Sequence, residues 1–285
     1  MTLRLFGAGG AFTRTLGTTC SMITLRSGRR WLIDCGRQAP DQLHDAGYCW
    51  HDIEGQIITH VHGDHVFGLE DFAFSRFFYG KGGVPSTIES GHGPKFIAHS
   101  AVIDEVWETL APALRYLRDE RGNRRAGTLE TYFDIIRPAD FEPPRQNPWR
   151  HSERFQADGF ELVARESEHV PGKPSCSLEI GVSEDAADDR IAWWSGDCTV
   201  DSEFLKAIEP RTTVFFHDCT FVDYPGQVHG FFDLLAALPE RVRSKMVLMH
   251  HEDDIEANRA LVEAAGFRVA LPGHAYDLES GRRIE

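Results

Sequence analysis

A short histidine-rich run constrains this chain more than any other feature. The run spans residues 59–65, with the sequence Thr-His-Val-His-Gly-Asp-His, and it follows an apolar, strand-like segment. Because side chains alternate along an extended chain, His60 and His62 point to the same side. The turn after them can return Asp64 and His65 toward a second position nearby. Imidazole nitrogens and carboxylate oxygens suit zinc, manganese or iron, so the run predicts a paired metal site.

The same run resembles the His-x-His-x-Asp-His signature of the metallo-β-lactamase superfamily. Its extended form, Thr-His-Val-His-Gly-Asp-His-Val-Phe-Gly-Leu, is most similar to the ribonuclease Z branch. The resemblance implies an α/β (α+β) fold, a four-layer αββα metallo-β-lactamase sandwich with its site at one sheet edge. Helix-like and strand-like segments alternate after residue 200, an order that also favours two sheets flanked by helices. We expect one metallo-β-lactamase-fold domain over residues 1–285, with a helical and irregular insertion at about 100–155.

Two metals need more ligands than one short run supplies, and the chain offers them after later strand-like segments. His169, Asp197 and His250 each follow such a segment, where side chains from several strands can converge. His251 is the adjacent rival, and we favour His250 because the family's histidine directly follows the strand. The resemblance implies this ligand set: His60, His62 and His169 for the first ion, Asp64, His65 and His250 for the second, and Asp197 bridging both.

A second resemblance to ribonuclease Z concerns the leaving group. The segment 214–221 resembles the His-Glu-Ala-Thr-Phe segment of that branch, with Asp218 in place of the glutamate, which shortens the carboxylate's reach. His229 stands where the branch carries the histidine that protonates the leaving group, oriented by a paired acid. A neighbouring carboxylate raises an imidazole's pKa and fixes its tautomer, as general acid chemistry near pH 7 requires. The rival interpretation is that His229 is a water-exposed residue at the start of a helix.

Together these residues predict a hydrolase with two divalent cations. Zinc is the default from the ligand types, and Mn²⁺ or Fe²⁺ would accept the same mixture. Metal coordination lowers the pKa of water to about 7, which makes hydroxide available as a nucleophile. Asp64 can hydrogen-bond this hydroxide as well as bind metal. Since His229 and Asp218 would serve a departing oxygen, we predict that the substrate is a phosphodiester.

Charge bears on which phosphodiester is cleaved. The formal net charge is −14, which disfavours a broad nucleic-acid surface. The region 115–150 is the only candidate for a basic arm that could grip RNA. We therefore rank a cyclic nucleotide or other small phosphodiester above RNA, with a ribonuclease Z-like endonuclease as the runner-up. Related members of the fold that cleave cyclic mononucleotides act as homodimers, which implies a homodimer here. Two further hypotheses are a lactone or ester hydrolase of the same fold and a metal-binding scaffold without turnover.

Further expectations concern location and local structure. No stretch approaches a membrane-spanning length, and the N-terminus lacks a secretory apolar region, so we expect a cytoplasmic protein without a membrane partner. The six cysteines form no Cys-x-x-Cys pair, which favours free thiols.

Three segments near the N-terminal half carry more specific expectations. The Gly-rich loop 7–12 lies near the metal site by the resemblance, or is a tight turn that requires positive φ. The aromatic-rich segment 69–79 predicts a buried helix, from which Phe72 could stack a base, although core packing is the stronger interpretation; Tyr224 is the second stacking candidate. The segment 101–118 predicts a helix that ends in a basic, solvated patch at Arg115, Arg118, Arg121, Arg124 and Arg125.

Overall fold

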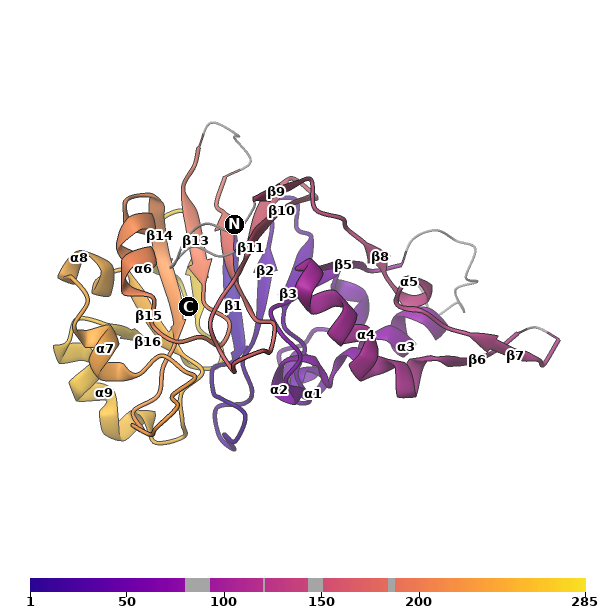
Figure 1. Ribbon diagram of the computed structural model, residues 1–285, viewed down its shortest axis with the longest axis horizontal. Coiled ribbons are helices and arrows are strands. Elements are labelled where there is room, and N and C mark those ends of the chain that lie inside the picture. Colours follow the sequence, from indigo (N-terminus) through magenta and orange to yellow (C-terminus); the bar gives the residue numbers. More distant parts are fainter. Residues whose placement is uncertain (80–92, 120, 143–150, 184–187) are drawn as a thin grey trace.

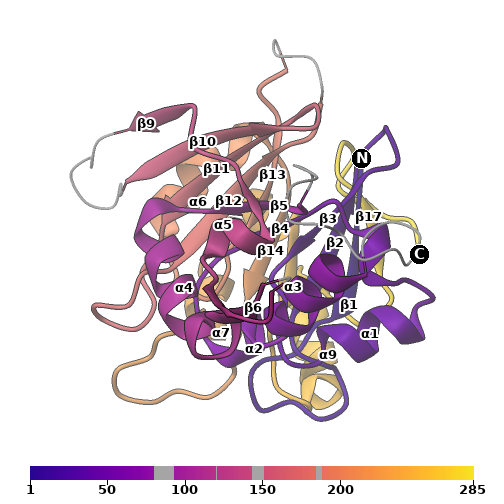
Figure 2. The ribbon, with the colours of Figure 1, turned by 90° about the vertical axis from the view of Figure 1, so that its right-hand side faces the viewer.

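Two β-sheets face each other, and helices cover the outer face of each (Figure 1). The computed structural model describes residues 1–79, 93–119, 121–142, 151–183 and 188–285. Figure 2 shows α1, α3 and α4 in front of the first sheet, and Figure 1 places α6 to α9 on the far side of the second. This is the four-layer αββα arrangement, so the predicted fold class is confirmed.

The first sheet contains the N-terminal strands and a C-terminal pair. Its order is β18 (Arg282–Arg283), β17 (Ala275–Asp277), β1 (Thr2–Gly7), β2 (Cys20–Thr24), β3 (Arg30–Ile33), β4 (Gly55–Ile58), β5 (Lys95–Ala98) and β8 (Asp134–Ile135). Pairing is antiparallel from β18 to β3 and parallel from β3 to β8. Parallel neighbours need long crossovers. The helical segments of these crossovers are α1 (Ala39–Asp45), η1 (Trp50–Asp52), α2 (Gly63–Val66), α3 (Leu69–Phe78), α4 (Ser100–Leu114) and α5 (Leu129–Tyr132).

The second sheet has the mirrored organisation. Its order is β16 (Arg268–Val269), β15 (Met246–Met249), β14 (Thr212–Asp218), β13 (Ile191–Trp194), β12 (Cys176–Gly181), β11 (Phe160–Glu166), β10 (Ser152–Ala157) and β9 (Asp140–Glu142). Strands β13 to β16 are parallel and the others antiparallel. The connecting helical segments are α6 (Ser202–Ile208), η2 (Glu209–Arg211), α7 (Phe232–Ala236), α8 (Glu240–Arg243) and α9 (Ile255–Ala264).

Strand β13 shows how the layers are packed. Its successive residues Trp193 and Trp194 point to opposite faces. Trp194 belongs to the apolar cluster between the sheets, and Trp193 to the cluster beneath the C-terminal helices. Burial on both faces explains why this strand reads as a continuous apolar run rather than an alternating one. The sheets also join where Cys176 N donates a hydrogen bond to Thr59 O at 3.0 Å, beside the histidine-rich run.

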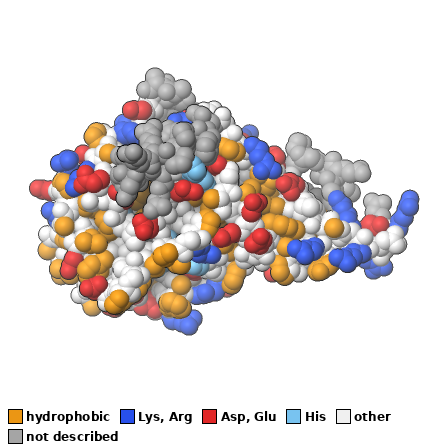
Figure 3. Space-filling view, viewed as in Figure 1, with side chains coloured by type: hydrophobic (Ala, Val, Ile, Leu, Met, Phe, Trp, Pro, Cys, Tyr) orange, Lys and Arg blue, Asp and Glu red, His pale blue; other side chains and the backbone are white. Residues whose placement is uncertain are grey.

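One expected helix is partly wrong. Helix α4 ends at Leu114, and β6 (Tyr116–Arg118) then pairs with β7 (Arg124–Ala126) in a hairpin. A turn interrupts the helical pattern: Gly122 has φ +84°, and its N–H donates to Asp119 O at 3.0 Å. Of the predicted basic patch, Arg115 does lie at the end of α4, whereas Arg118, Arg121, Arg124 and Arg125 lie on and beside a projecting hairpin. Basic side chains gather there in Figure 3.

The remaining expectations have mixed outcomes. The helix predicted at 69–79 is confirmed by α3, and Phe72 is buried in the core against Trp50 and Phe133. Within the predicted insertion, Asp140–Glu142 form strand β9 rather than irregular structure, while residues 143–150 lie outside the described residues. The cysteines are free, as predicted. The insertion at about 100–155 within a single domain stays a prediction. In the described part of the chain, no helix is long and apolar enough to cross a membrane.

Candidate metal centre

The predicted ligands gather where strands of both sheets end. Parallel strands place their carboxyl ends at one sheet edge, which is where open α/β sheets form their sites. The sources are the loop after β4 for His60 and His62, α2 for Asp64 and His65, and the loops after β11, β13 and β15 for His169, Asp197 and His250. The structure thus brings together all of the predicted residues, which lie far apart in the sequence.

Three imidazole nitrogens and a carboxylate form the first group. His60 Nε2 lies 3.0 Å from His62 Nδ1, and His169 Nε2 lies 3.2 Å from the same His62 atom. The Oδ2 atom of Asp197 lies 3.7 Å from His60 Nε2 and 3.9 Å from His169 Nε2. These four ligand atoms all lie within 4.8 Å of one another.

The second group shares Asp197 and is equally compact. His65 Nε2 lies 3.4 Å from Asp64 Oδ2 and 3.3 Å from Asp197 Oδ1. His250 Nε2 lies 3.3 Å from each of the same two carboxylate oxygens. The two oxygens of Asp197 therefore face different groups, Oδ2 the first and Oδ1 the second. His251 stays outside both groups, since its Nε2 lies 3.1 Å from the carbonyl oxygen of Ala270.

These separations fit divalent cations. A tetrahedral zinc ion with bonds near 2.1 Å sets its ligand atoms about 3.3–3.4 Å apart. The distances within the second group match that value, and those of the first group lie around it. His65 Nε2 and Asp197 Oδ1 are buried without a hydrogen-bond partner among the described residues. Such atoms are costly to bury unless something binds them.

Burial and charge set the protonation of the two groups differently. Burial lowers the pKa of His60 well below its ordinary range, and that of His62 to about 4. Both rings are thus neutral near pH 7, the form that binds metal. Burial opposes charge on His65 too, but Asp197, Asp64 and Asp34 raise its pKa well above the usual value. Burial likewise disfavours the Asp64 anion, yet His65 and His250 hold its pKa below the usual value. The second group thus places carboxylate anions close to imidazoles that readily take up a proton. A bound cation would change this balance of charge.

Asp34 is a site residue that the sequence reasoning missed. It directly follows β3, is fully buried and adopts φ +60°. Its carboxylate accepts hydrogen bonds from Thr59 N at 2.9 Å, Thr59 Oγ1 at 2.8 Å and His65 Nδ1 at 2.8 Å. The bond from Nδ1 fixes the His65 tautomer and leaves Nε2 facing the second group. An acid directly after the apolar strand, in Leu-Ile-Asp-Cys-Gly, was the available signal.

The Gly-rich loop 7–12 does abut the centre, as the resemblance implies. Gly10 N donates to His251 O at 3.1 Å, and a Cβ on Gly10 would lie 3.1 Å from His250 Cε1. The expectation of a turn that needs positive φ is wrong, because the positive-φ glycines lie elsewhere in the described chain. A side chain at Gly10 is disfavoured because it would lie too close to the His250 ring, not because of the backbone conformation of Gly10.

His229 and Asp218 form a hydrogen-bonded pair beside both groups. His229 Nδ1 donates to Asp218 Oδ2 at 2.8 Å, so the shorter carboxylate reaches its partner. Burial alone would lower the pKa of His229, but the Asp218 hydrogen bond and charge raise it to about 9. His229 Nδ1 also lies 3.9 Å from Asp197 Oδ2, which places this imidazole next to the shared carboxylate. The rival interpretation, a water-exposed residue at a helix start, accounts for none of these contacts.

A cavity of about 620 Å³ opens over this centre. Its walls include ligands from both groups together with His229, Arg37 and an apolar rim. The rim contains Phe12, which is 90% exposed, with Phe67 and Tyr224 also solvent-accessible. A volume in this range suits a small organic ligand, and exposed aromatic rims favour planar groups.

The αββα sandwich and its paired His/Asp groups define a metallo-β-lactamase-fold protein. Solved structures with this architecture align with the chain almost end to end. The metallo-beta-lactamase fold protein YhfI from Bacillus subtilis gives a TM-score of 0.67 at 17% identity, and the alignment covers 96% of this chain and 98% of YhfI. The short form of human tRNase Z gives 0.64 at 19% identity, covering 98% and 99%.

Sequence comparison narrows the class to a family. The family model described as Anti-Pycsar protein Apyc1 matches residues 1–272, and the chain belongs to that family. An Anti-Pycsar protein Apyc1 from Paenibacillus harenae is 28% identical over 279 residues, which span 98% of this chain and 100% of the relative. The resemblance to the metallo-β-lactamase superfamily is therefore confirmed.

Proposed function

We propose that this protein is a metal-dependent phosphodiesterase that hydrolyses a cyclic nucleotide or another small phosphodiester. The observation that carries the proposal is the His229–Asp218 pair beside two metal-ligand groups in one cavity. A proton donor in that position serves the oxygen that leaves when a phosphodiester is cleaved. Membership of the family described as Anti-Pycsar protein Apyc1 supports the same proposal.

The proposed site holds two divalent cations, Zn²⁺ by ligand type, with Mn²⁺ or Fe²⁺ as substitutes. When bound, such ions lower the pKa of water to about 7 and offset phosphate charge. The chain's own residues would do the rest. Asp64 would orient the attacking nucleophile as well as bind metal, and Asp218 would hold His229 by its Nδ1–H. That bond leaves Nε2 as the nitrogen that donates a proton to the departing ribose oxygen.

Charge and shape favour a small substrate over RNA. Arg37 is the only lysine or arginine among the described residues that line the cavity, enough for one phosphate but not for a long backbone. A separate group of exposed arginines, Arg115, Arg118, Arg121 and Arg124, lies at and beside the β6–β7 hairpin (Figure 3). On the cavity rim, Phe12, Phe67 and Tyr224 could hold a nucleobase by stacking.

We further propose a cytoplasmic homodimer. Tyr116 is 57% exposed on the hairpin, where the Arg124 guanidinium lies 4.6 Å from its ring centroid. An exposed aromatic with a cationic neighbour on a projecting element is typical of interface residues. Light scattering should give a dimer mass that Tyr116→Glu reduces to the monomer. A monomeric parent protein would contradict the dimer while leaving the proposed chemistry standing.

A substrate panel on zinc-loaded protein tests the function. The panel contains cyclic mononucleotides, bis-p-nitrophenyl phosphate, precursor transfer RNA and a lactone. We expect cyclic nucleotides to be cleaved best, and His229→Ala to lose most of that turnover while its metal content stays intact. His44→Ala, which alters an exposed histidine outside the cavity lining, is the matched control. Transfer RNA cleaved far faster would indicate a ribonuclease, lactone turnover unaffected by His229→Ala would indicate an ester hydrolase, and no turnover at all would indicate a scaffold.

A further inference from the structure

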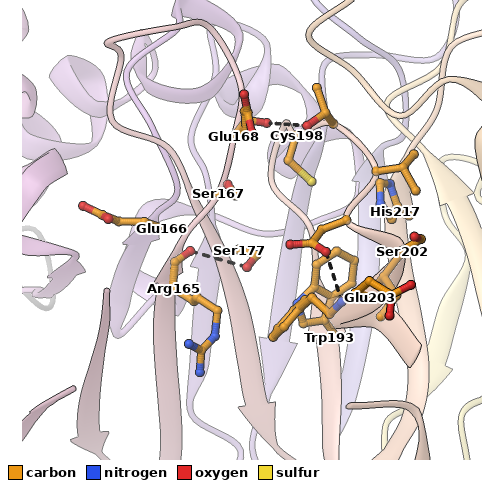
Figure 4. Close-up of a pocket in the computed structure, with 15 residues that line it drawn as sticks. Arg165, Glu166, Ser167, Glu168, Ser177, Trp193, Cys198, Ser202, Glu203 and His217 are labelled. Carbon is orange, nitrogen blue, oxygen red and sulfur yellow. Dashed lines mark hydrogen bonds between the residues drawn. The ribbon is translucent and has the colours of Figure 1, made fainter. Parts of the chain in front are cut away.

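A second cavity lies on the other side of the strand ends that form the metal centre. It has a volume of about 260 Å³ and lies between the outer face of β11 to β14 and helix α6 (Figure 4). Its wall includes Cys198 and His217, the immediate neighbours in sequence of Asp197 and Asp218. The chain just after β13 therefore contributes to both cavities, Asp197 to the first and Cys198 to the second.

Two buried nitrogens in this cavity have no hydrogen-bond partner within the described part of the chain, Trp193 Nε1 and His217 Nε2. Trp193 is 2% exposed and His217 is 0% exposed, and their ring centroids lie 5.3 Å apart. The indole N–H is a donor only. His217 Nδ1 donates to the backbone carbonyl of Asp218 at 2.8 Å, which leaves Nε2 as the ring nitrogen that can accept a hydrogen bond. Burying a polar group without a hydrogen-bond partner is unfavourable, so this donor and acceptor favour a bound partner.

The charges around the cavity exclude an anion. Glu166, Glu168, Asp201 and Glu203 contribute carboxylates to its lining, against the single guanidinium of Arg165. That guanidinium is already engaged, since Arg165 Nε donates to Glu179 at 3.2 Å. A phosphate or carboxylate ligand would thus meet net repulsion. The Trp193 and Phe204 rings, 6.2 Å apart, provide apolar surface instead.

We propose that this cavity binds a neutral planar heterocycle carrying a carbonyl beside an N–H, as in a nucleobase or nucleoside. The ligand's carbonyl accepts from Trp193 Nε1, and its N–H donates to His217 Nε2. Such an amide edge supplies both missing partners from adjacent atoms, and neutrality avoids the carboxylates. A nucleotide with a free phosphate is disfavoured by the same carboxylates.

A ligand in this cavity would be linked to the proposed proton donor, His229, through only two residues, His217 and Asp218. Asp218 Oδ1 lies 3.1 Å from His217 Nδ1, and Asp218 Oδ2 accepts from His229 Nδ1 at 2.8 Å. A ligand that holds His217 also fixes the carboxylate that orients His229. This consequence rests on the proposed function, whereas the binding site itself does not.

Isothermal titration of the zinc-loaded protein tests the site. Uridine and inosine, which carry the amide edge, should bind, and 3-methyluridine, whose N–H is replaced, should bind at least tenfold more weakly. Trp193→Phe should cost uridine a similar factor, and the matched control Trp107→Phe, on α4, should cost nothing. His217→Asn, which deletes Nε2 but keeps a donor for the Asp218 carbonyl, should weaken binding as well. The ligand comparison needs no variant, so a folding defect in Trp193→Phe would not mask the result.

The titration also distinguishes binding in this cavity from binding in the cavity over the metal centre. Tyr224→Ala alters the metal-site rim and should leave uridine affinity unchanged. No binding of either nucleoside, equal binding of 3-methyluridine, or loss of binding in Tyr224→Ala alone would overturn the proposal. Uridine bound by a protein that cleaves no phosphodiester would refute the proposed function and leave this site standing. In active protein, uridine should change cyclic-nucleotide turnover, and that response should disappear in Trp193→Phe.

Discussion

Asp218→Asn should uncouple the proposed proton donor from its partner at nearly constant volume. Every group around this carboxylate is a donor: Oδ2 accepts from His229 Nδ1 at 2.8 Å and Cys198 N at 3.3 Å, and Oδ1 accepts from Gly230 N at 3.3 Å. An amide in this place must turn its own N–H₂ toward one of these sets. We therefore expect a loss of stability of about 1–3 kcal/mol from donors left unpaired.

The larger effect concerns the pKa of His229. Its ordinary value is 6.5 and its surroundings raise it to about 9. That difference corresponds to about 3 kcal/mol in favour of the protonated ring. Burial alone would lower the pKa of His229, and the hydrogen bond and charge of Asp218 are the largest causes that raise it. Without that carboxylate the pKa should fall to about 6.5 or below. At pH 8 the protonated fraction would drop from about nine-tenths to about 3%, roughly a 30-fold loss of competent acid.

The sign of this effect follows from the raised pKa. The protonated ring is stabilised fully below pH 6.5, and this stabilisation is lost as the pH rises through about 9. The parent's turnover of cyclic nucleotide should therefore decline only near that alkaline value, and in Asp218→Asn the decline should begin near neutrality.

Two substrates sharpen the assay. Bis-p-nitrophenyl phosphate, whose leaving group departs as a stable anion, should lose far less activity than a cyclic nucleotide. Metal content measured on the same samples controls for damage to the neighbouring ligand groups. An alkaline limb that stays in place, or equal losses on both substrates, would refute the assignment of His229 as the acid.

Three further outcomes follow from the site. Removing metal with a chelator should abolish turnover and lower the unfolding temperature, because the buried ligands lose their common partner; an unchanged melting curve after verified metal loss would argue against bound cations. Asp34→Asn should weaken metal affinity about 10–100-fold in a competition assay with a chromophoric chelator, since His65 loses its orienting acceptor; parent-like affinity would contradict that role. Tyr224→Ala should raise KM for cyclic nucleotides about 5- to 100-fold, as expected for one lost stacking contact. It should change little for bis-p-nitrophenyl phosphate, and a uniform change would point to misfolding instead.

The residues that gather at the centre were predictable because each one interrupts a recognisable local pattern. His169, Asp197 and His250 each follow an apolar run, and strands that end at one sheet edge bring such residues together. Asp34 carries the same local signal, but its partners are Thr59 and His65, more than twenty residues away. Its importance depends on the parallel pairing of β3 with β4, which local pattern does not reveal.

The wrong helix prediction for residues 115–118 has a different cause. Helical periodicity continues past Leu114 in residue type, yet the chain leaves the helix there and pairs Tyr116 with Ala126. That pairing depends on the turn at Gly122. Local propensity is a weak guide where a glycine-containing turn offers a competing hairpin. Strand β17 was missed because its partner β1 lies at the other end of the chain, whereas β10 was missed although it pairs with the neighbouring strand β11.

Two residues with strained backbone conformations, Asp34 and His250, break the alternation of side chains at the ends of their strands. Asp34 has φ +60° and His250 has φ +55°, left-handed conformations that cost non-glycine residues roughly 1–3 kcal/mol each. Each is the first residue after a parallel strand, β3 in one sheet and β15 in the other. A further extended residue would continue the strand's alternation, whereas the left-handed conformation breaks it. The Asp34 side chain then bonds Thr59 and His65, and the His250 side chain contacts Asp64. The strands that lead into these residues are largely buried, since every residue of β15 is buried and β3 is buried from Trp31 to Ile33. Both sheets therefore contribute one strained residue to the second group, Asp34 by orienting His65 and His250 by facing the carboxylates directly.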